Sequence, residues 1–382
     1  MLYGDGKHDD TRALQEMLDA CGIVTIEKPG TYLVCRTLLI HSHTRLVLAP
    51  GVTLLAAPRS CCALIQNEHF EDPGKKDVQI EIVGGIFDGN CDEMGLDPMA
   101  LALTREDAPY SPARFSGKLL RFAHVQNILL EKLTVRDPVG YGIQIADAEG
   151  FITRDIYFDY NSHFGCTDGV HVNGPARNGV IENVYGVTND DVVSLTTVDE
   201  MHAEVTKGEI EDVEIRNVSS TNGYSAVRLL SSGGFAMRHI RICGIYGTYR
   251  HYGILISHHD IRPGTANFFD GITVEHVHAS KADRPLPPEC FCYWEGDGIE
   301  KRAIIRLRAG KEALHVGRLV LRDVVRHQKT PTSAPLVQLD SGVSIDRLVL
   351  DNLHQTAAPG ITLPLVINDA EIGELIARDV QG

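Results

Sequence analysis

Two short segments of the chain place aspartates directly before apolar residues that read as strands. CTDGVHVNG (166–174) carries Asp168, and TNDDVVSL (188–195) carries Asp190 and Asp191. If the two strands are neighbours in a parallel sheet, their spacing of about 4.8 Å brings these carboxylates together. Carboxylates that close suit a general acid beside a general base, or a site for a hard cation such as Ca²⁺. An aspartate before a strand more often forms an Asx turn, but three of them on two successive strands favour chemistry.

A repeat of strand-like segments runs through the chain and must position these aspartates. One series of period-2 segments starts at Ile128, Phe151, Gly179, Val213, Ile240, Ile272, Leu319, Leu348 and Leu375. A second series starts at Gly142, Gly169, Val192, Ala226, Gly253, Ile304, Leu336 and Leu365. Repeats of roughly 25 to 30 residues without helices predict the turns of a parallel β-helix, since propeller blades need about 40 to 45 residues. Aligning the segments of the second series by their inward-facing residues places Gln144, His171, Ser194 and Arg228 in one column of outward-facing positions.

The organisation expected from this repeat is a single β-helix domain over residues 1–382. Apolar residues at helical spacing predict one helix over 10–21, which would cover the N-terminal end of the stack. Three longer excursions, at about 91–118, 258–268 and 280–303, are expected to wall a groove.

Several segments resemble a known superfamily. YGDGKHDDTRALQ (3–15), GTYLV (30–34), LVLAPGVTLLA (46–56) and GGIFDGN (84–90) resemble the pectin-lyase-like right-handed parallel β-helices. NILLEKLTVRDPVGYGIQI (127–145) and the two aspartate segments look more specifically like polygalacturonase-type (family 28-like) glycoside hydrolases. The resemblance implies an all-β, single-stranded right-handed parallel β-helix that hydrolyses a poly- or oligosaccharide, for example a galacturonide-containing one in pectin or plant cell walls.

The resemblance also implies roles for the aspartates. Asp190 would be the general acid, and Asp168 and Asp191 would activate the attacking water, with inversion at the anomeric carbon. Inverting enzymes usually hold the acid and the base about 6.5–9.5 Å apart. Two further motifs of that family, Gly-His-Gly and Arg-Ile-Lys, are missing from the segments where they would fall, 223–230 and 252–259.

Other polar and aromatic side chains are candidates for binding the substrate. His171 lies beside the aspartates, and Arg228 could clamp a carboxylate or pair with Asp191. No metal or cofactor is predicted. The full set of predicted substrate-binding residues is Gln144, His171, Tyr224, Arg228, His251, His258 and Trp294.

Composition narrows the partners and the compartment. The net charge is −15, with 36 basic and 51 acidic residues and no basic run, which argues against nucleic acid. No apolar run of about 18 residues predicts a membrane span. The chain reads as cytoplasmic because MLYGDG leads directly into the domain and the nine cysteines are an odd number, which favours reduced thiols. A secreted or periplasmic protein whose signal had been removed would show the same sequence features. The sequence predicts no oligomeric state.

Two other functions remain open on the sequence. A Ca²⁺-dependent polysaccharide lyase could use the aspartates as ligands and Arg228 as its base. A non-catalytic saccharide-binding β-helix, such as an adhesin, could carry the same architecture.

Overall fold

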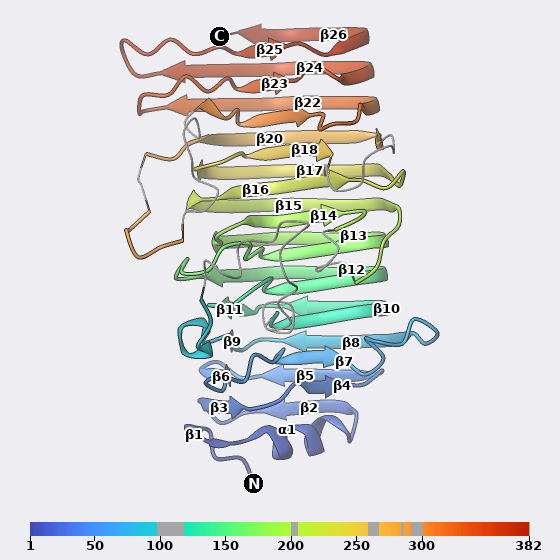
Figure 1. Ribbon diagram of the computed structural model, residues 1–382, viewed down its shortest axis with the longest axis vertical. Coiled ribbons are helices and arrows are strands. Elements are labelled where there is room, and N and C mark those ends of the chain that lie inside the picture. The colour runs from blue at the N-terminus through green and yellow to red at the C-terminus, as the bar shows by residue number, and fades with distance from the viewer. Residues whose placement is uncertain (98–117, 200–204, 259–266, 284–285, 292–300, 382) are drawn as a thin grey trace.

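The computed structural model describes residues 1–97, 118–199, 205–258, 267–283, 286–291 and 301–381 (Figure 1). The described strands form one 26-stranded sheet that winds up the long axis of the molecule, with parallel pairing between successive turns. The predicted parallel β-helix is confirmed. Within the described chain, no helix is both long enough and apolar enough to cross a bilayer.

The strands stack in three ladders, one for each face of the β-helix. The first ladder contains β2 (Gly22–Ile26), β5 (Thr44–Leu48), β8 (Asp77–Val83), β10 (Leu120–Glu131), β12 (Ile143–Asp159), β13 (Val170–Val187), β15 (Ile210–Gly223), β17 (Ala236–Tyr249), β20 (Ile272–Lys281), β22 (Leu314–Gln328), β24 (Val343–Ala357) and β26 (Glu371–Gln381). The second ladder begins with β1 (Asp5–Asp9), β3 (Gly30–Val34), β6 (Val52–Ala56), β9 (Ile86–Asp88) and β11 (Thr134–Arg136), and continues in the C-terminal parts of the long strands. A short strand, β19 (Asn267–Asp270), joins β17 to β22.

The third ladder carries the aspartate segments. It contains β4 (Leu38–Ile40), β7 (Ile65–Asn67), the first residues of β10, β12 and β13, and then β14 (Asp191–Thr196), β16 (Ser225–Ser231), β18 (Ile254–His258), β21 (Ile305–Arg308), β23 (Val337–Leu339) and β25 (Val366–Asn368).

Both predicted strand series are in register. Their nine and eight segments fall in the first and third ladders, and the outward column pairs Gln144 with His171, His171 with Ser194, and Ser194 with Arg228. The inward column next to it is fully buried, and each such Val or Ile side chain contributes about 1.5–3 kcal/mol. This column consists of Ile143, Val170, Val193, Val227 and Ile254.

Two corners of the β-helix are built from left-handed residues stacked rung upon rung. Such a residue bends a long strand between two faces while the hydrogen-bonded ladder continues on either side. Asparagine and aspartate tolerate this conformation better than other non-glycine residues, and Asn183 donates to Asp155 (2.8 Å) while Asn217 donates to Asn183 (3.0 Å). One corner column is His43, Gln79, Asn127, Gly150, Asn178, Asp212, His239 and Gly271, and the other is Gly84, Lys132, Asp155, Asn183, Asn217, Gly244, His276, Asp323, Asn352 and Asp379.

The N-terminal end of the stack is covered by a helix, as expected. Helix α1 (Thr11–Leu18) is shorter than the predicted range, and its buried Leu14 and Leu18 pack over apolar residues of the first rungs such as Val24 and Leu46. The carboxylate of Asp10 does not cap the helix but accepts hydrogen bonds from two backbone amides of the preceding loop. Strand β1, which precedes the helix, was not predicted.

Candidate active site

The third ladder brings the three predicted aspartates together. Asp168 lies just before β13, Asp191 is the first residue of β14, and Asp190 precedes it. The Asp191 amide donates to Asp168 Oδ1 at 3.1 Å, and one oxygen of each of the three carboxylates lies within 4.8 Å of the others. This spacing is closer than the 6.5–9.5 Å range expected for an inverting pair, because successive rungs, not loops, carry the side chains.

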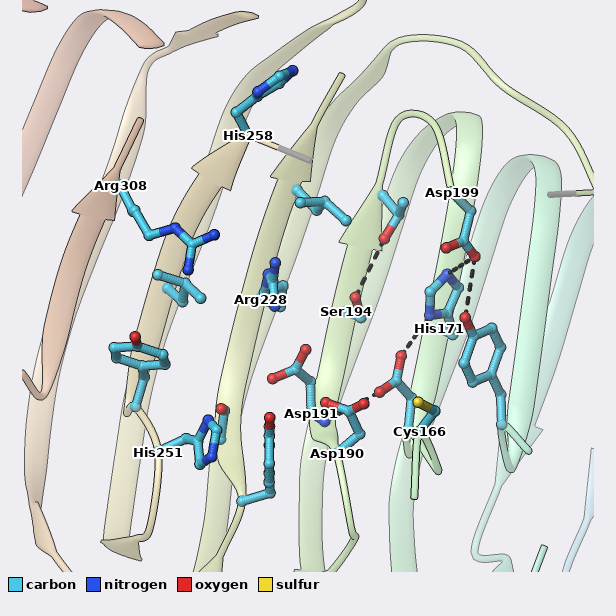
Figure 2. A pocket seen from close by; sticks show the side chains of 18 of the residues that line it. Cys166, His171, Asp190, Asp191, Ser194, Asp199, Arg228, His251, His258 and Arg308 are labelled. Carbon is cyan, nitrogen blue, oxygen red and sulfur yellow. Dashed lines mark hydrogen bonds and ion pairs between the residues drawn. The ribbon is translucent and has the colours of Figure 1, made fainter. Parts of the chain in front are cut away.

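A cavity of about 360 Å³ opens over these carboxylates (Figure 2). Its acidic end is formed by Asp168, Asp190, Asp191 and Asp199, and its basic end is lined by Arg228, His251, His258, Arg302 and Arg308. The two ends follow the β-helix axis, from β13 and β14 at the acidic end to β18 and β21 at the basic end.

The carboxyl of Asp191 has a strongly raised pKa. Its burial and the neighbouring charge of Asp168 raise its pKa to about 7, although Arg228 and a hydrogen bond from Ser225 act in the opposite direction. Its Oδ1 atom is buried and has no hydrogen-bond partner among the described residues. Near neutral pH this carboxyl is therefore divided between its protonated and charged forms.

His171 links two of the carboxylates. Its Nδ1 lies 2.6 Å from Asp168 Oδ2, and its Nε2 lies 3.0 Å from Asp199 Oδ2. Burial alone would lower the pKa of His171, but the charge of Asp199 and the hydrogen bond with Asp168 outweigh it and raise the pKa to about 9. At neutral pH this ring is an imidazolium that donates to both carboxylates.

Gln144 lies elsewhere than predicted. Its side chain is fully buried and is not part of the cavity wall. It donates to Asn173 Oδ1 at 2.9 Å and accepts from Lys118 Nζ at 3.3 Å. Its place in the outward column was predicted correctly, but the side chain is buried through its contacts with Lys118 and Asn173 and is not among the residues that line the cavity.

The basic end contains the remaining predicted binding residues that the structure describes. Tyr224 stacks on His251 with ring centroids 3.8 Å apart, and Arg302 Nη1 lies 3.1 Å from His251 Nε2. The Nε atom of Arg228 is buried without a hydrogen-bond partner in the described part of the chain, and His258 is buried at the cavity wall. Trp294 lies outside the described residues.

Among the wall residues that the sequence did not assign to the site are Tyr141, Asp199, Arg302 and Arg308. Arg308 had a usable signal, because the register carries the column of Thr196 and Leu230 onto it through Ser257. Asp199 and Arg302 lie in connections between strands, where period-2 alternation gives no direction for a side chain.

The excursion predicted at 280–303 reaches the site through its described residues. Asn189 Nδ2, next to Asp190 in sequence, donates to the Phe291 carbonyl at 2.8 Å, and the Phe291 amide donates to the Ser162 carbonyl at 2.7 Å. With Arg302 at the basic end, this excursion does contribute to the cavity wall.

The three aspartates are also close enough to hold a cation. The positive charges of His171 and Arg228 disfavour a bound cation, because they already lower the pKa of Asp191 in the way that a cation would. Within the described residues, Glu275 of a second such cluster is already paired with Arg241 and Arg322.

Among the described cysteines, Cys61 and Cys62 are free thiols despite their adjacency.

Solved structures with this fold include polysaccharide-acting enzymes. The endo-xylogalacturonan hydrolase of Aspergillus tubingensis is 16% identical over 97% of this chain and 94% of its own, with a TM-score of 0.64. A family 28 exopolygalacturonase of Yersinia enterocolitica is 16% identical over 97% of this chain and 76% of its own, with a TM-score of 0.60. PfbA, a surface adhesin of Streptococcus pneumoniae, is 15% identical over 100% of this chain and 92% of its own, with a TM-score of 0.54.

The chain shares the parallel β-helix fold of these structures. No protein-family model and no curated protein sequence matches it. At such low identity the structural likeness establishes the fold alone, and enzymes and an adhesin share it. The function must therefore be argued from the cavity.

Proposed function

We propose that the protein is a glycoside hydrolase that acts on an anionic poly- or oligosaccharide. The observation that carries the proposal is the gathering of three carboxylates within 4.8 Å in the wall of a cavity, with the pKa of one of them raised to about 7. General acid–base catalysis needs two carboxyls in different protonation states at the same pH, and their environments set this difference.

Asp190 is assigned as the general acid. It is only partly buried, unlike Asp168 and Asp191, so it can approach the leaving oxygen of a bound sugar. Asp168 and Asp191 lie on adjacent rungs in the cavity wall and together can orient and deprotonate a water molecule.

The basic end supports an anionic sugar beside the scissile bond. Arg228, Arg302 and Arg308 line the cavity opposite the carboxylates. Guanidinium groups bind carboxylates with strong, geometrically specific hydrogen bonds. Two proteins with this fold are an exopolygalacturonase and an endo-xylogalacturonan hydrolase, which agrees with a uronic-acid substrate here.

Direct attack by water would invert the anomeric carbon. The carboxylate oxygens lie nearer the roughly 5–5.5 Å of retaining enzymes than the spacing of inverting ones. We assign inversion because two carboxylates flank one water position on neighbouring rungs. Proton NMR of the first product formed, before mutarotation, distinguishes the two outcomes.

A polysaccharide lyase is the second candidate function. The three aspartates could bind Ca²⁺, and Arg228, which lines the cavity, would be the candidate for the base that removes the α-proton. The lyase ranks lower because His171 and Arg228 already supply positive charge to the carboxylates.

The test is a panel of acidic and neutral plant and microbial polysaccharides, with reducing ends and ultraviolet absorbance measured together. New reducing ends without an ultraviolet-absorbing product, unchanged by a chelator, support the hydrolase. An unsaturated product whose formation stops with chelator would identify the lyase. Saccharide binding without turnover across the panel would identify a binding protein.

A further inference from the structure

A chain of buried polar groups extends from Asp168 along the cavity wall, on the side away from Asp190 and Asp191. His171 is 3% exposed and lies between Asp168 and Asp199, with one ring nitrogen on each carboxylate. Figure 2 shows the imidazole between them, with Asp199 on the side remote from Asp190 and Asp191. An imidazole that contacts a carboxylate through both nitrogens can satisfy both contacts only as the imidazolium.

The ring has little freedom to turn. It stacks on Tyr141 with centroids 4.0 Å apart and an interplanar angle of 6°. The Tyr141 hydroxyl donates to Asp199 Oδ2 at 3.2 Å, and Asn173 Nδ2 lies 3.3 Å from the same oxygen. Asp199 is therefore anchored on its own side, and His171 is held between two fixed carboxylates.

Both carboxylate oxygens of Asp168 have a hydrogen-bond partner. Oδ2 faces His171 Nδ1 at 2.6 Å, and Oδ1 accepts the Asp191 amide at 3.1 Å. Both contacts favour a charged carboxylate in one orientation. Among the described residues, further charged or titratable groups near the ring include Asp191, the Tyr141 hydroxyl, and Lys118, whose Nζ lies 4.4 Å from the Tyr141 ring centroid.

We propose that Asp199 is a positioning residue: it holds His171 as an imidazolium between two carboxylates and so fixes the orientation and charge of Asp168. The inference rests on the proposed hydrolase function, in which Asp168 helps to activate water. Asp199 itself does not contact the reacting atoms; it acts through His171. A purely structural Asp199 would affect stability but not the protonation of His171 or the pH dependence of turnover.

The first measurement does not need a substrate. The His171 ring is titrated by nitrogen-15 NMR in the wild type and in Asp199→Asn, and its signals are identified by their loss in His171→Gln. Because an opposite charge within about 4–6 Å shifts a pKa by roughly 1–3 units, the pKa of His171 should fall by about one unit or more in Asp199→Asn. The backbone amide spectrum of the variant shows whether the fold is retained.

The second measurement uses turnover on the substrate found in the panel. In the wild type, kcat/KM should fall on the alkaline side as His171 loses its proton. In Asp199→Asn the pH at which kcat/KM falls should decrease by the same amount as the pKa of His171, and activity should recover at lower pH. A one-unit shift corresponds to about tenfold in turnover on the alkaline side.

Asp147→Asn is the matched control. It breaks another carboxylate–imidazole pair, His124 Nδ1 to Asp147 Oδ2 at 2.8 Å, outside the cavity. It should leave the His171 titration and the alkaline limb unchanged.

The outcomes separate the two proposals. An unchanged His171 titration in folded Asp199→Asn would overturn the positioning role, as would an alkaline limb that stays in place while the titration moves. If the wild type hydrolyses nothing in the panel while His171 still shifts, the hydrolase assignment fails, and Asp199 is left as the group that controls the charge of a binding site.

Discussion

The acidic end of the cavity comes from one short stretch of chain, whereas its basic end is assembled from several distant ones. Asp168 and Asp199, the first and last acidic residues, bracket a segment that covers two adjacent rungs. Arg228 and Arg308 come from strands β16 and β21, and Arg302 from the excursion between β20 and β21. The acidic end is thus fixed by the repeat itself, apart from Asp199 beyond the end of β14, while the basic end depends on which side chains later rungs and an excursion present.

This difference predicts different tolerance to change. The positions of the carboxylates follow the backbone register, so a substitution there changes chemistry and charge but not geometry. The arginines reach the cavity on long side chains, so substitutions there should mainly change what is bound. The predictions below test this division, from the largest expected effect to the smallest.

Asp190→Asn should have the largest effect on turnover. Loss of a general acid typically costs about 10²–10⁴-fold in rate. The loss should be smallest for aryl glycosides with good leaving groups, because these need little protonation. Steady-state kinetics on natural and aryl substrates measures the difference, and folded Asp190→Asn with wild-type turnover would show that the acid is another group.

Asp191→Asn should stabilise the protein at alkaline pH. The pKa of Asp191 is raised from 3.8 to about 7, so the fold favours its protonated form, and stability is lost as the pH rises from about 4 through 7. The asparagine removes this cost, which reaches at most about 4 kcal/mol above pH 7.

Denaturant unfolding of wild type and Asp191→Asn at pH 4 and pH 8 measures the effect. The variant should gain stability over the wild type only at the higher pH. Asp212→Asn, at an exposed corner position, is the control and should show no such gain. An equal difference at both pH values would mean that Asp191 is not a strained charge.

Arg308→Gln should weaken the binding of anionic substrates. A hydrogen bond to a charged group is worth about 1.5–3 kcal/mol, so KM should rise roughly 10- to 100-fold while kcat changes little. A neutral oligosaccharide should show no comparable rise. Arg322→Gln is the control, because Arg322 pairs with Glu275 and Asp351 outside the cavity. A fall in kcat at constant KM would place Arg308 among the reacting groups instead.

The smallest expected effect is on stability, and it comes from alanine substitutions at glycines that precede strands at the acidic and basic ends of the cavity. A Cβ on Gly169 would lie 2.5 Å from the Phe158 ring and from the Val192 carbonyl, whereas one on Gly253 would meet Ile304 at 3.0 Å. Overpacking typically costs about 1–3 kcal/mol, so Gly169→Ala should lower stability more than Gly253→Ala. Gly74→Ala, near only one exposed carboxylate, is the control. Equal losses would indicate that the two ends are packed alike.

The sequence predicted the acidic end well for a physical reason. In a stacked fold, residues one repeat apart are neighbours, so aligning the strands was enough to pair Asp168 with the rung of Asp191. The same alignment located His171 but could not show Asp199 against it, because Asp199 lies beyond the end of β14. Gln144 was read as a wall residue because alternation gives a side chain's direction, not what covers it.

The basic end was predicted only in part. Arg228, His251 and His258 sit on or beside aligned strands and do line the cavity, whereas Arg302 belongs to an excursion whose path has no repeat to follow. The helix range was too long because Cys21, read as its last apolar residue, has a left-handed backbone and begins a corner instead.

The columns of left-handed corner residues have a consequence for how the chain folds. Each corner residue pairs with the corner residue one rung away, so each rung closes against a neighbour about 23 to 48 residues distant in sequence. Most contacts are therefore between adjacent repeats, and such stacks fold by nucleation and propagation. We expect folding to start at an inner pair of rungs with large apolar side chains, such as β12 with Phe151 and Phe158, and to spread toward both ends. The carboxylates of the cavity, on the next rungs, would then be in place early, before the later turns of the stack deliver the arginines.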